Sequence, residues 1–454
     1  MMKLMIKPFS ACMASALLAG AAMAAVSADE AATLKSTLTP VGAEKAGNKD
    51  GTIPAWTGGF TTPTPGFKNG GRRPDPFASD KPVYSITAKN MAQYADKLTD
   101  GTKAMLEKYP ETFRVEVYPT KRTFAAPQWF YEKTFKNATH VKTVEGGAGP
   151  RPEGASGGVP FPIPKNGVEV MLNHQLVWTP ENMHEVAKNF TVASNGQSVM
   201  VSHYENYFTH PYNGLNSDAA EGQWWMKVRS TNLGPAIRAG ESIVTHFNVD
   251  ESKTQTWVYL TGQRRVRKLP NSCCDTPTPF SAGLISFDEL GTFEGDMSRF
   301  DWKLLGKKEV VIPYNSNRTM VPTKTADVIK GRHLNPDHVR WELHRVWVVE
   351  ATLKDGKRHT SPKSRYYVDE DSWIAVLGDR WDAQGKLARI AYTIPIAMPD
   401  VPAVMRSSFG VYDIINGTSY IGSLFNEESE QMRIDKPYST STFSPEAMAG
   451  EGIR

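Results

Sequence analysis

The chain has 454 residues, and its 52 lysines and arginines nearly balance its 48 aspartates and glutamates. A nucleic-acid-binding protein normally carries a strongly basic face, so this balance argues against a nucleic-acid partner. Only three cysteines occur, and two of them, Cys273 and Cys274, are neighbours, which excludes a framework of disulfides. We expect this pair to be two loop thiols; a redox or metal-binding pair is the alternative.

Residues 1–24 have the composition of a cleavable signal peptide. Two lysines precede a mostly apolar run over residues 9–22, and residues 22–24 (Ala-Met-Ala) give the small-x-small pattern of a cleavage site. The run is too short for a stable membrane-spanning helix. Cys12 lies inside it, whereas a lipoprotein signal needs its cysteine at the end. We therefore predict a secreted protein of the periplasm, with association with the outer membrane left open.

The mature chain divides into three predicted parts. Residues 25–82 are punctuated by turn-forming residues and form an extended arm that lies across the surface, with Trp56 as an anchor. Residues 83–438 form a single large domain with long loops. Residues 439–454 are small and polar and form a tail that we expect to fray.

A helix is predicted between Thr87 and Tyr109. Thr87 is a suitable N-cap, the apolar residues after it recur at helical spacing, and Pro110 closes the run. An amphipathic helix of this kind typically covers a sheet. A long loop follows over residues 146–164, which are dense in Gly and Pro.

From about residue 168 onward the sequence predicts mainly strands. The clearest strand runs from Trp341 to Leu353, where apolar residues alternate with polar ones such as Glu342 and His344. One face of this strand should meet a core and the other mostly water. Asp355-Gly356 then predicts a hairpin turn. The other predicted strands are Ser242–Val249, Thr254–Val266, Leu304–Pro313, Arg365–Val368, Trp373–Leu377 and Leu387–Ile394.

Short turns, including those at residues 369–371 and 382–385, join four of these strands: Trp341–Leu353, Arg365–Val368, Trp373–Leu377 and Leu387–Ile394. This arrangement predicts an antiparallel meander. The strands do not alternate with helices, so a parallel α/β fold is disfavoured. The predicted class is therefore α+β, mainly antiparallel β.

Signatures of catalysis and metal binding are weak in this sequence. Ser156 lies within Gly154–Gly158, which matches the G-x-S-x-G pattern of hydrolases, but no strand is evident before it and no helix after it, as that pattern requires. Four histidines in one short segment lack the spacing of a helical zinc motif, and we interpret them as surface and loop residues: His333, His338, His344 and His359. We therefore predict no catalytic residues, no metal and no cofactor.

Apolar and aromatic residues on the predicted strands are the remaining candidates for a site. Their ordinary role is to fill a core. Their alternative role is to line an open half-barrel that shelters an apolar ligand, since ligand sites are mostly apolar with a few polar groups. The candidate lining residues are Trp257, Tyr259, Trp341, Leu343, Trp347, Val349 and Trp373.

Linked motifs extend over nearly the whole mature chain. They are LTPVGAE at residues 38–44, DGTIPAWTGG at 50–59, YLTGQRRVR at 259–267, DTP at 275–277, RFDWKLLGKKE at 299–309, IPYN at 312–315, LHRVWVVEA at 343–351 and YVDEDSW at 367–373. With these motifs the chain resembles an envelope family, domain of unknown function 1329. The resemblance implies a fold similar to the periplasmic lipoprotein carrier and its outer-membrane receptor, in which a curved antiparallel sheet, an incomplete β-barrel, is covered by helices around an apolar cavity.

The resemblance also implies transport of lipids or other hydrophobic molecules, together with an RND-type envelope transporter and an outer-membrane protein, and it implies no catalytic residues. Our first hypothesis is a periplasmic carrier, which requires an apolar cavity that the protein's own side chains leave unfilled. The second is a structural adaptor that bridges envelope transport components without a ligand. A hydrolase that uses Ser156 is the least favoured reading.

Overall fold

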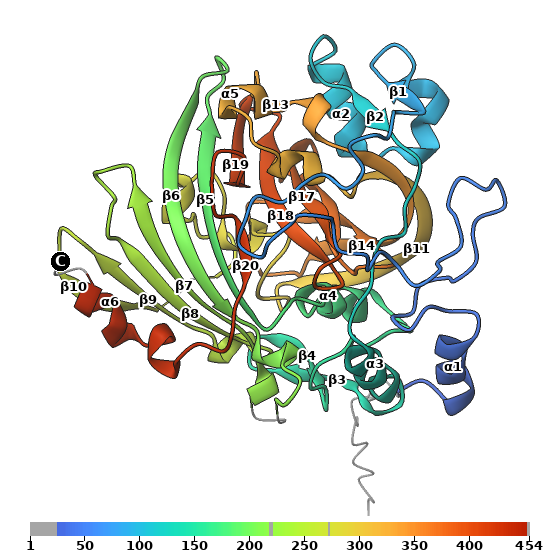
Figure 1. The fold of residues 1–454 in the computed structure, drawn as a ribbon, viewed down its shortest axis with the longest axis horizontal. Helices are drawn as coiled ribbons and strands as arrows, with labels where there is room; N and C mark the ends of the chain where they lie inside the picture. Colours follow the sequence, from blue (N-terminus) through green and yellow to red (C-terminus); the bar gives the residue numbers. More distant parts are fainter. Residues whose placement is uncertain (1–24, 218–220, 271–272, 452–454) are drawn as a thin grey trace, which may run out of the picture.

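The protein folds around one large, curved β-sheet (Figure 1). The structure is a computed structural model that describes residues 25–217, 221–270 and 273–451, so the predicted signal peptide lies outside the described residues. The sheet has 16 strands, and its end strands β1 (Tyr84–Ile86) and β10 (Arg265–Leu269) do not pair with each other. The sheet is therefore open, which confirms the predicted class of a mainly antiparallel fold with an incompletely closed sheet.

The strands follow one another across the sheet in two blocks that meet where β19 pairs with β5. Every pairing in the sheet is antiparallel except a parallel bridge between β2 and β14. In order across the sheet, the strands after β1 are β2 (Val115–Val117), β14 (Trp341–Leu353), β15 (Lys363–Asp369), β16 (Ala375–Trp381), β17 (Leu387–Met398), β18 (Ala403–Asp413), β19 (Thr418–Leu424), β5 (Asn182–Val192), β6 (Ser198–Thr209), β7 (Trp224–Gly234), β8 (Ser242–Asn248), β9 (Gln255–Leu260) and β10.

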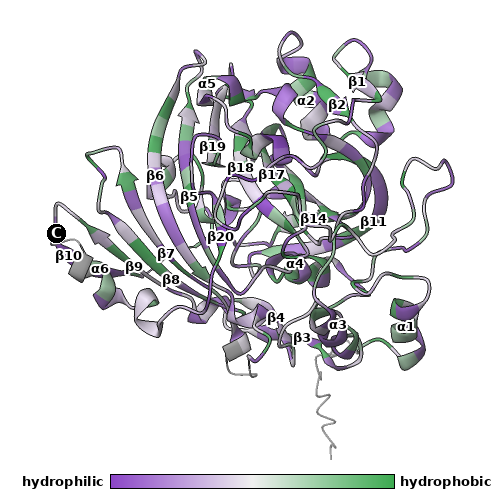
Figure 2. Ribbon diagram, viewed as in Figure 1, coloured by the Kyte–Doolittle hydropathy of each residue, from purple (hydrophilic) through white to green (hydrophobic). Residues whose placement is uncertain are grey.

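Further strands extend this sheet or form small hairpins beside it. Within the sheet, β11 (Phe300–Pro313) pairs with β14 and β20 (Met432–Ile434) pairs with β5. Two separate hairpins consist of β3 (Lys142–Gly146) with β4 (Gly149–Glu153), and of β12 (Ile329–Lys330) with β13 (His333–Leu334). Figure 2 shows hydrophobic and hydrophilic residues mixed along the long strands β5 and β6, without a strict alternation.

The helices are short and lie around the sheet. The α-helices are α1 (Ala28–Ala32), α2 (Asp100–Lys108), α3 (Gln128–His140), α4 (Gly167–Gln175), α5 (Thr325–Val328) and α6 (Pro445–Glu451). The 3-10 helices are η1 (Thr33–Lys35), η2 (Met91–Lys97), η3 (Pro211–Asn213), η4 (Glu221–Gln223), η5 (Glu251–Lys253), η6 (Pro279–Ser281), η7 (Phe287–Glu289), η8 (Asn317–Met320), η9 (Pro336–His338) and η10 (Thr440–Phe443). Among the described residues, no helix combines the length and the apolar character that crossing a membrane demands.

The predicted meander is confirmed as β14 to β17, which pair consecutively and antiparallel. Several predicted strands have wrong boundaries, and two of them have a clear physical reason. The single strand predicted over residues 254–266 is two strands, because the chain turns at Arg264, which adopts a φ of 48°. The strand predicted from Trp373 begins at Ala375, since the Trp373 indole donates to the Val41 carbonyl (3.0 Å) and holds that residue in the preceding turn.

The single helix predicted between Thr87 and Tyr109 is also wrong. The chain forms η2, becomes extended at Leu98 (φ −110°, ψ 142°) and starts again as α2. The Thr99 hydroxyl accepts a hydrogen bond from the Thr102 N–H (3.0 Å) and caps the new helix. A good N-cap in the middle of an apolar periodic run thus divides it into two elements.

The polar face of β14 does not meet water near the start of the strand, contrary to the prediction. Glu342 is 0% exposed and His344 is 2% exposed. The segment that contains Lys121 crosses this face, and the backbone N–H of Lys121 donates to the Glu342 carboxylate (2.8 Å). The charged groups of this face therefore bind other parts of the chain, and the interpretation of His344 as a surface histidine is wrong.

Residues 25–82 contain little regular structure but are attached to the rest of the molecule. Val41 and Ile53 are both 2% exposed and belong to the main hydrophobic core. The Trp56 indole donates to the Phe124 carbonyl (3.0 Å). This segment therefore contributes side chains to the core as well as crossing its surface.

Candidate functional site

An apolar cavity of about 30 Å³ lies between the sheet and α2. A buried water needs roughly 10–15 Å³ of such volume, so this closed form leaves room for about two waters. The lining residues are Thr102, Met105, Phe113, Arg114, Pro313, Leu334, Pro336, Val339, Trp341, Leu377, Ile390, Tyr392, Ile394 and Tyr412.

Local sequence patterns explain the two main walls of the cavity. Ile390, Tyr392 and Ile394 alternate along β17, so their side chains point to the same face of the sheet. Thr102 and Met105 are three residues apart in α2, which places both on the helix face that covers the sheet. The remaining lining residues come from loops and other strands, so only the complete fold brings them together.

Two stacked tyrosines are among the polar residues that line the cavity. The rings of Tyr392 and Tyr412 lie with their centroids 4.7 Å apart, and the Leu334 N–H donates to the Tyr412 hydroxyl (3.3 Å). Burial raises the pKa of both hydroxyls, so both remain protonated and neutral at ordinary pH. Arg114 is the one charged residue of the lining, and it pairs with Glu116 and Asp337. The cavity therefore suits an uncharged, mainly apolar guest.

The structure separates the predicted lining residues into two regions. Trp341 lines the cavity. Leu343, Val349, Trp347 and Trp373 lie in or against the same main core, where the last two stack with ring centroids 6.3 Å apart. The other two predicted residues, Trp257 and Tyr259, lie on β9 near the far end of the sheet, in a separate cluster with Val244 and Met448. The seven residues therefore do not form one site.

Sequence reasoning missed most of the residues that line the cavity. It singled out tryptophans, which pack well in any core, whereas the cavity is lined mainly by Met105, Leu377, Ile390, Tyr392 and Tyr412. The alternating run in β17 is the signal that could have identified part of this wall. The contribution of α2 follows only from its docking on the sheet.

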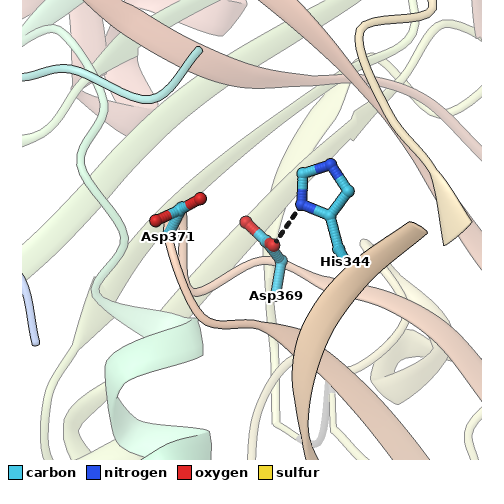
Figure 3. A group of neighbouring side chains, drawn as sticks. All are labelled: His344, Asp369 and Asp371. Carbon is cyan, nitrogen blue, oxygen red and sulfur yellow. Dashed lines mark hydrogen bonds and ion pairs between the residues drawn. The ribbon is translucent and has the colours of Figure 1, made fainter. Parts of the chain in front are cut away.

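A second candidate is the buried group of His344, Asp369 and Asp371, whose side chains point toward one another (Figure 3). His344 Nδ1 lies 3.0 Å from Asp369 Oδ1, and its Nε2 lies 3.2 Å from Glu342 Oε2. Arg122 donates two hydrogen bonds to Asp371, of 2.9 and 2.7 Å. The turn predicted at residues 369–371 is thus confirmed, but it is buried rather than solvated.

The electrostatics of this group follow from its burial and its pairing. Burial alone would lower the pKa of His344, but the hydrogen bonds and charges of Asp369 and Glu342 outweigh it and raise that pKa to about 10. Burial would raise the pKa of Asp369, yet its contacts with His344 and Ser372 lower it. His344 is therefore a buried cation between two carboxylates.

Three such side chains could hold a metal ion, although the sequence predicted none. Metal ligation needs a free lone pair on the imidazole and on each carboxylate. Here both nitrogens of His344 face carboxylates, and the Arg122 guanidinium already binds both oxygens of Asp371. This donor set fits a network of ion pairs that joins separate segments better than it fits a metal site.

The remaining sequence candidates are scattered. Ser156 lies in a loop that follows β4, and the next helix, α4, begins only at Gly167, so the hydrolase pattern does not occupy a strand-to-helix turn. His333 is fully buried and the buried His359 side chain binds Asp288 (2.8 Å), so neither is a surface residue, although His359 does lie in a loop as interpreted. Cys273 and Cys274 form a disulfide with each other, and the expectation of two loop thiols is wrong.

Comparison with known proteins gives a clear match in sequence and distant matches in structure. The profile of the family described as protein of unknown function (DUF1329) matches residues 85–449. An uncharacterized protein from Pseudomonas aeruginosa is 39% identical over 448 residues, which cover 97% of each chain. The resemblance seen in the sequence is thereby confirmed.

Two solved structures illustrate the distant matches. A DUF1329 family protein from Desulfovibrio piger is 15% identical with a TM-score of 0.42, and the match covers 62% of this chain and 97% of that one. A LolA superfamily protein from Nitrosomonas europaea is 11% identical with a TM-score of 0.36, and the match covers 62% of this chain and 98% of that one.

Proposed function

The chain belongs to the DUF1329 family, and from this premise we propose that it is a periplasmic binding protein that carries a lipid or another hydrophobic molecule. The observation that supports this proposal is the apolar cavity beside Trp341, which the surrounding side chains leave unfilled. Protein interiors are normally close-packed, so an unfilled apolar volume between a sheet and a short helix is an obvious place for a guest.

The cavity must widen to accept a lipid. Ligand pockets typically measure roughly 300–1,000 Å³, which is at least about tenfold more than the 30 Å³ of this cavity. The cover that can move is α2, a helix of nine residues. Isolated helices of that length are marginal in water, so α2 depends on its packing against β16 and β17.

The polar contacts that hold α2 from outside are weak. Asp100 forms an exposed ion pair with Arg365 (3.2 Å), and Lys108 donates to the Ile414 carbonyl at the surface. Exposed ion pairs contribute only about 0–1 kcal/mol. Displacement of α2 therefore costs the apolar contacts of Met105 and Leu106, which a hydrophobic guest would replace. It also costs the hydrogen bond of the Gly101 backbone to the buried Asp379 carboxylate.

Filling the cavity tests the binding proposal. We expect Met105→Phe to occupy the void, to leave the free energy of unfolding within about 1 kcal/mol of the wild type, and to weaken binding of the apolar fluorophore N-phenyl-1-naphthylamine at least tenfold. Fluorescence titration measures the binding and urea denaturation the stability. Met91→Phe is the matched control, because Met91 packs on the same core from η2 but does not line the cavity. Equal binding by both variants would contradict a site at this cavity.

A direct measurement distinguishes the carrier from the alternative function, a structural adaptor that binds no ligand. Mass spectrometry of organic extracts from gently purified protein, beside an unrelated secreted protein, should reveal a specific enriched hydrophobic compound. A clean extract together with a co-purifying transporter would favour the adaptor. We propose no catalytic role for Ser156, and unchanged ester turnover by Ser156→Ala is the expected result.

Location and partners complete the proposal. We propose that residues 1–24 are cleaved on export, that residues 25–82 form the arm of a single domain spanning residues 83–438, and that residues 439–454 form its tail. The expectation that this tail frays is wrong, because α6 packs on β8, β9 and β10 and buries Met448. N-terminal sequencing of the mature protein tests the cleavage. An RND-type transporter and an outer-membrane protein are the proposed partners, on the basis of the family resemblance, and cross-linking in intact cells tests them.

A further inference from the structure

Exposed apolar side chains gather along one rim of the sheet. Among the described residues, seven large hydrophobic side chains stand out as exposed, and four of them lie on this rim. They are Val199 (50% exposed), Leu233 (46%), Ile237 (87%) and Ile415 (44%). Single exposed apolar residues are ordinary, but their concentration on one rim, with Ile237 almost fully in solvent, needs a reason.

Four hairpin turns build this rim. The antiparallel register places the turns at residues 193–197, 235–241, 261–264 and 414–417 at the same edge of the sheet. Neighbouring turns lie close together: a Cβ added to Gly240 would be 3.0 Å from Thr261 Cγ2, and one added to Gly417 would be 3.8 Å from Ser194 Cβ. Figure 1 shows the tips of the hairpins β5–β6, β7–β8 and β9–β10 following one another along one side of the molecule.

The rim is also basic. Residues 193–199, 233–243, 260–269 and 413–418 contain five basic residues and two acidic residues, Glu241 and Asp413, which already pair with Arg238 (2.9 Å) and Arg389 (3.9 Å). The other four are exposed and make no ion pair with any described residue: Arg264, Arg265, Arg267 and Lys268. The acidic residue Glu446 lies in α6, which packs on β8, β9 and β10. Unpaired positive charge therefore stands beside the protruding Ile237.

We propose that this rim docks on the surface of a membrane that contains anionic lipids, with Ile237 inserted among the lipids and the arginines of the β9–β10 hairpin on their head groups. Ile237 and Ile415 lie in separate turns, with Val199 and Leu233 at the adjoining ends of β6 and β7. Isolated aliphatic side chains of this kind suit a soft lipid surface, whereas the core of a protein interface is typically a continuous patch rich in aromatic residues. A row of Lys and Arg beside apolar anchors is the combination that binds anionic bilayers. This site is independent of the cavity proposed above.

Vesicle co-sedimentation of the mature chain tests the proposal. The wild type should sediment with vesicles of phosphatidylglycerol and phosphatidylcholine in equal parts but not with phosphatidylcholine alone. Each basic residue near such a surface strengthens binding about fivefold, so Arg265→Glu/Arg267→Glu should lose at least 25-fold. Burial of an isoleucine side chain contributes tenfold or more, so Ile237→Asp should lose at least tenfold.

The matched control is Val83→Asp. Val83 is 64% exposed but precedes β1, at the opposite end of the sheet, so this variant should bind like the wild type. Equal vesicle binding by Ile237→Asp and Val83→Asp would overturn the proposal. A wild type that binds vesicles with and without phosphatidylglycerol equally would also overturn it. So would a loss by Ile237→Asp that appears only on vesicles carrying outer-membrane proteins, because it would assign the rim to a protein partner. Met105→Phe should keep full vesicle binding, which separates a failure here from a failure of the binding proposal.

Discussion

At the scale of single residues, His344 makes the stability of the fold depend on pH. Its pKa is about 10 in the folded protein, raised from about 6.5, so the charged imidazole stabilises the folded state. A raised pKa gives stability that is fully present below about pH 6.5 and is lost as the pH rises through about 10. Asp369, whose pKa is lowered, acts in the opposite sense, because its contribution is lost only in acid.

We expect His344→Gln to lower the free energy of unfolding by about 3–5 kcal/mol at pH 6, because Asp369 then remains buried without this cation and Glu342 keeps only its pair with Arg340. The difference in the free energy of unfolding between the variant and the wild type should shrink as His344 of the wild type loses its charge toward pH 10. Urea denaturation of both proteins at pH 6, 8 and 10 measures the difference. His140→Gln, which changes an exposed histidine, should stay within about 0.5 kcal/mol at each pH. A deficit that does not vary with pH would contradict a charged His344.

At the scale of elements, the contact between α2 and the sheet depends on a glycine. A Cβ added to Gly101 would lie 2.2 Å from Asp379 Oδ1 and 3.0 Å from two side-chain atoms of Ile390. Gly→Ala inside a helix normally stabilises it by roughly 0.5–1 kcal/mol. We expect Gly101→Ala to destabilise the protein by about 1–3 kcal/mol instead, and to speed entry of N-phenyl-1-naphthylamine, because α2 must move outward. Stopped-flow fluorescence measures the entry rate; Lys103→Ala, also in α2, should change neither quantity.

Sequence patterns predicted the elements that obey a single period. The strand β14 follows from its alternation of two, and this prediction was correct. A turn does occur at Asp355-Gly356, but the connection to β15 runs over residues 354–362 and is longer than the predicted hairpin turn. The prediction of one helix between Thr87 and Tyr109 failed because the helical period of 3.6 does not show that Thr99 caps a new helix, α2, and so divides the run. The buried polar face of β14 could not be predicted either, since its partners lie far away in the sequence.

At the scale of the whole molecule, segments distant in sequence are joined by buried charges. Arg345 donates to the Glu44 and Ala46 carbonyls (3.1 and 2.7 Å) and to Glu370 (2.7 Å), which attaches residues 25–82 to the β15–β16 turn. The composition of that segment predicted turns but not these contacts, because Arg345 and Glu370 are distant in sequence and meet the segment only in the folded chain. The cavity shares this property, since its walls come from α2, η9, six strands and two loops.

A segment without regular structure that fills part of the core should unfold together with the sheet. Ile53 is 2% exposed within the main core, so we expect Ile53→Ala to lower the free energy of unfolding by about 2–5 kcal/mol, as for a core residue in a strand. Far-UV and tryptophan signals should then show one shared urea transition, shifted as a whole. Thr62→Ala, at an exposed position of the same segment, should leave the midpoint unchanged. A separate early transition in Ile53→Ala, with the main one unmoved, would mean that residues 25–82 only lie on a sheet that folds without them.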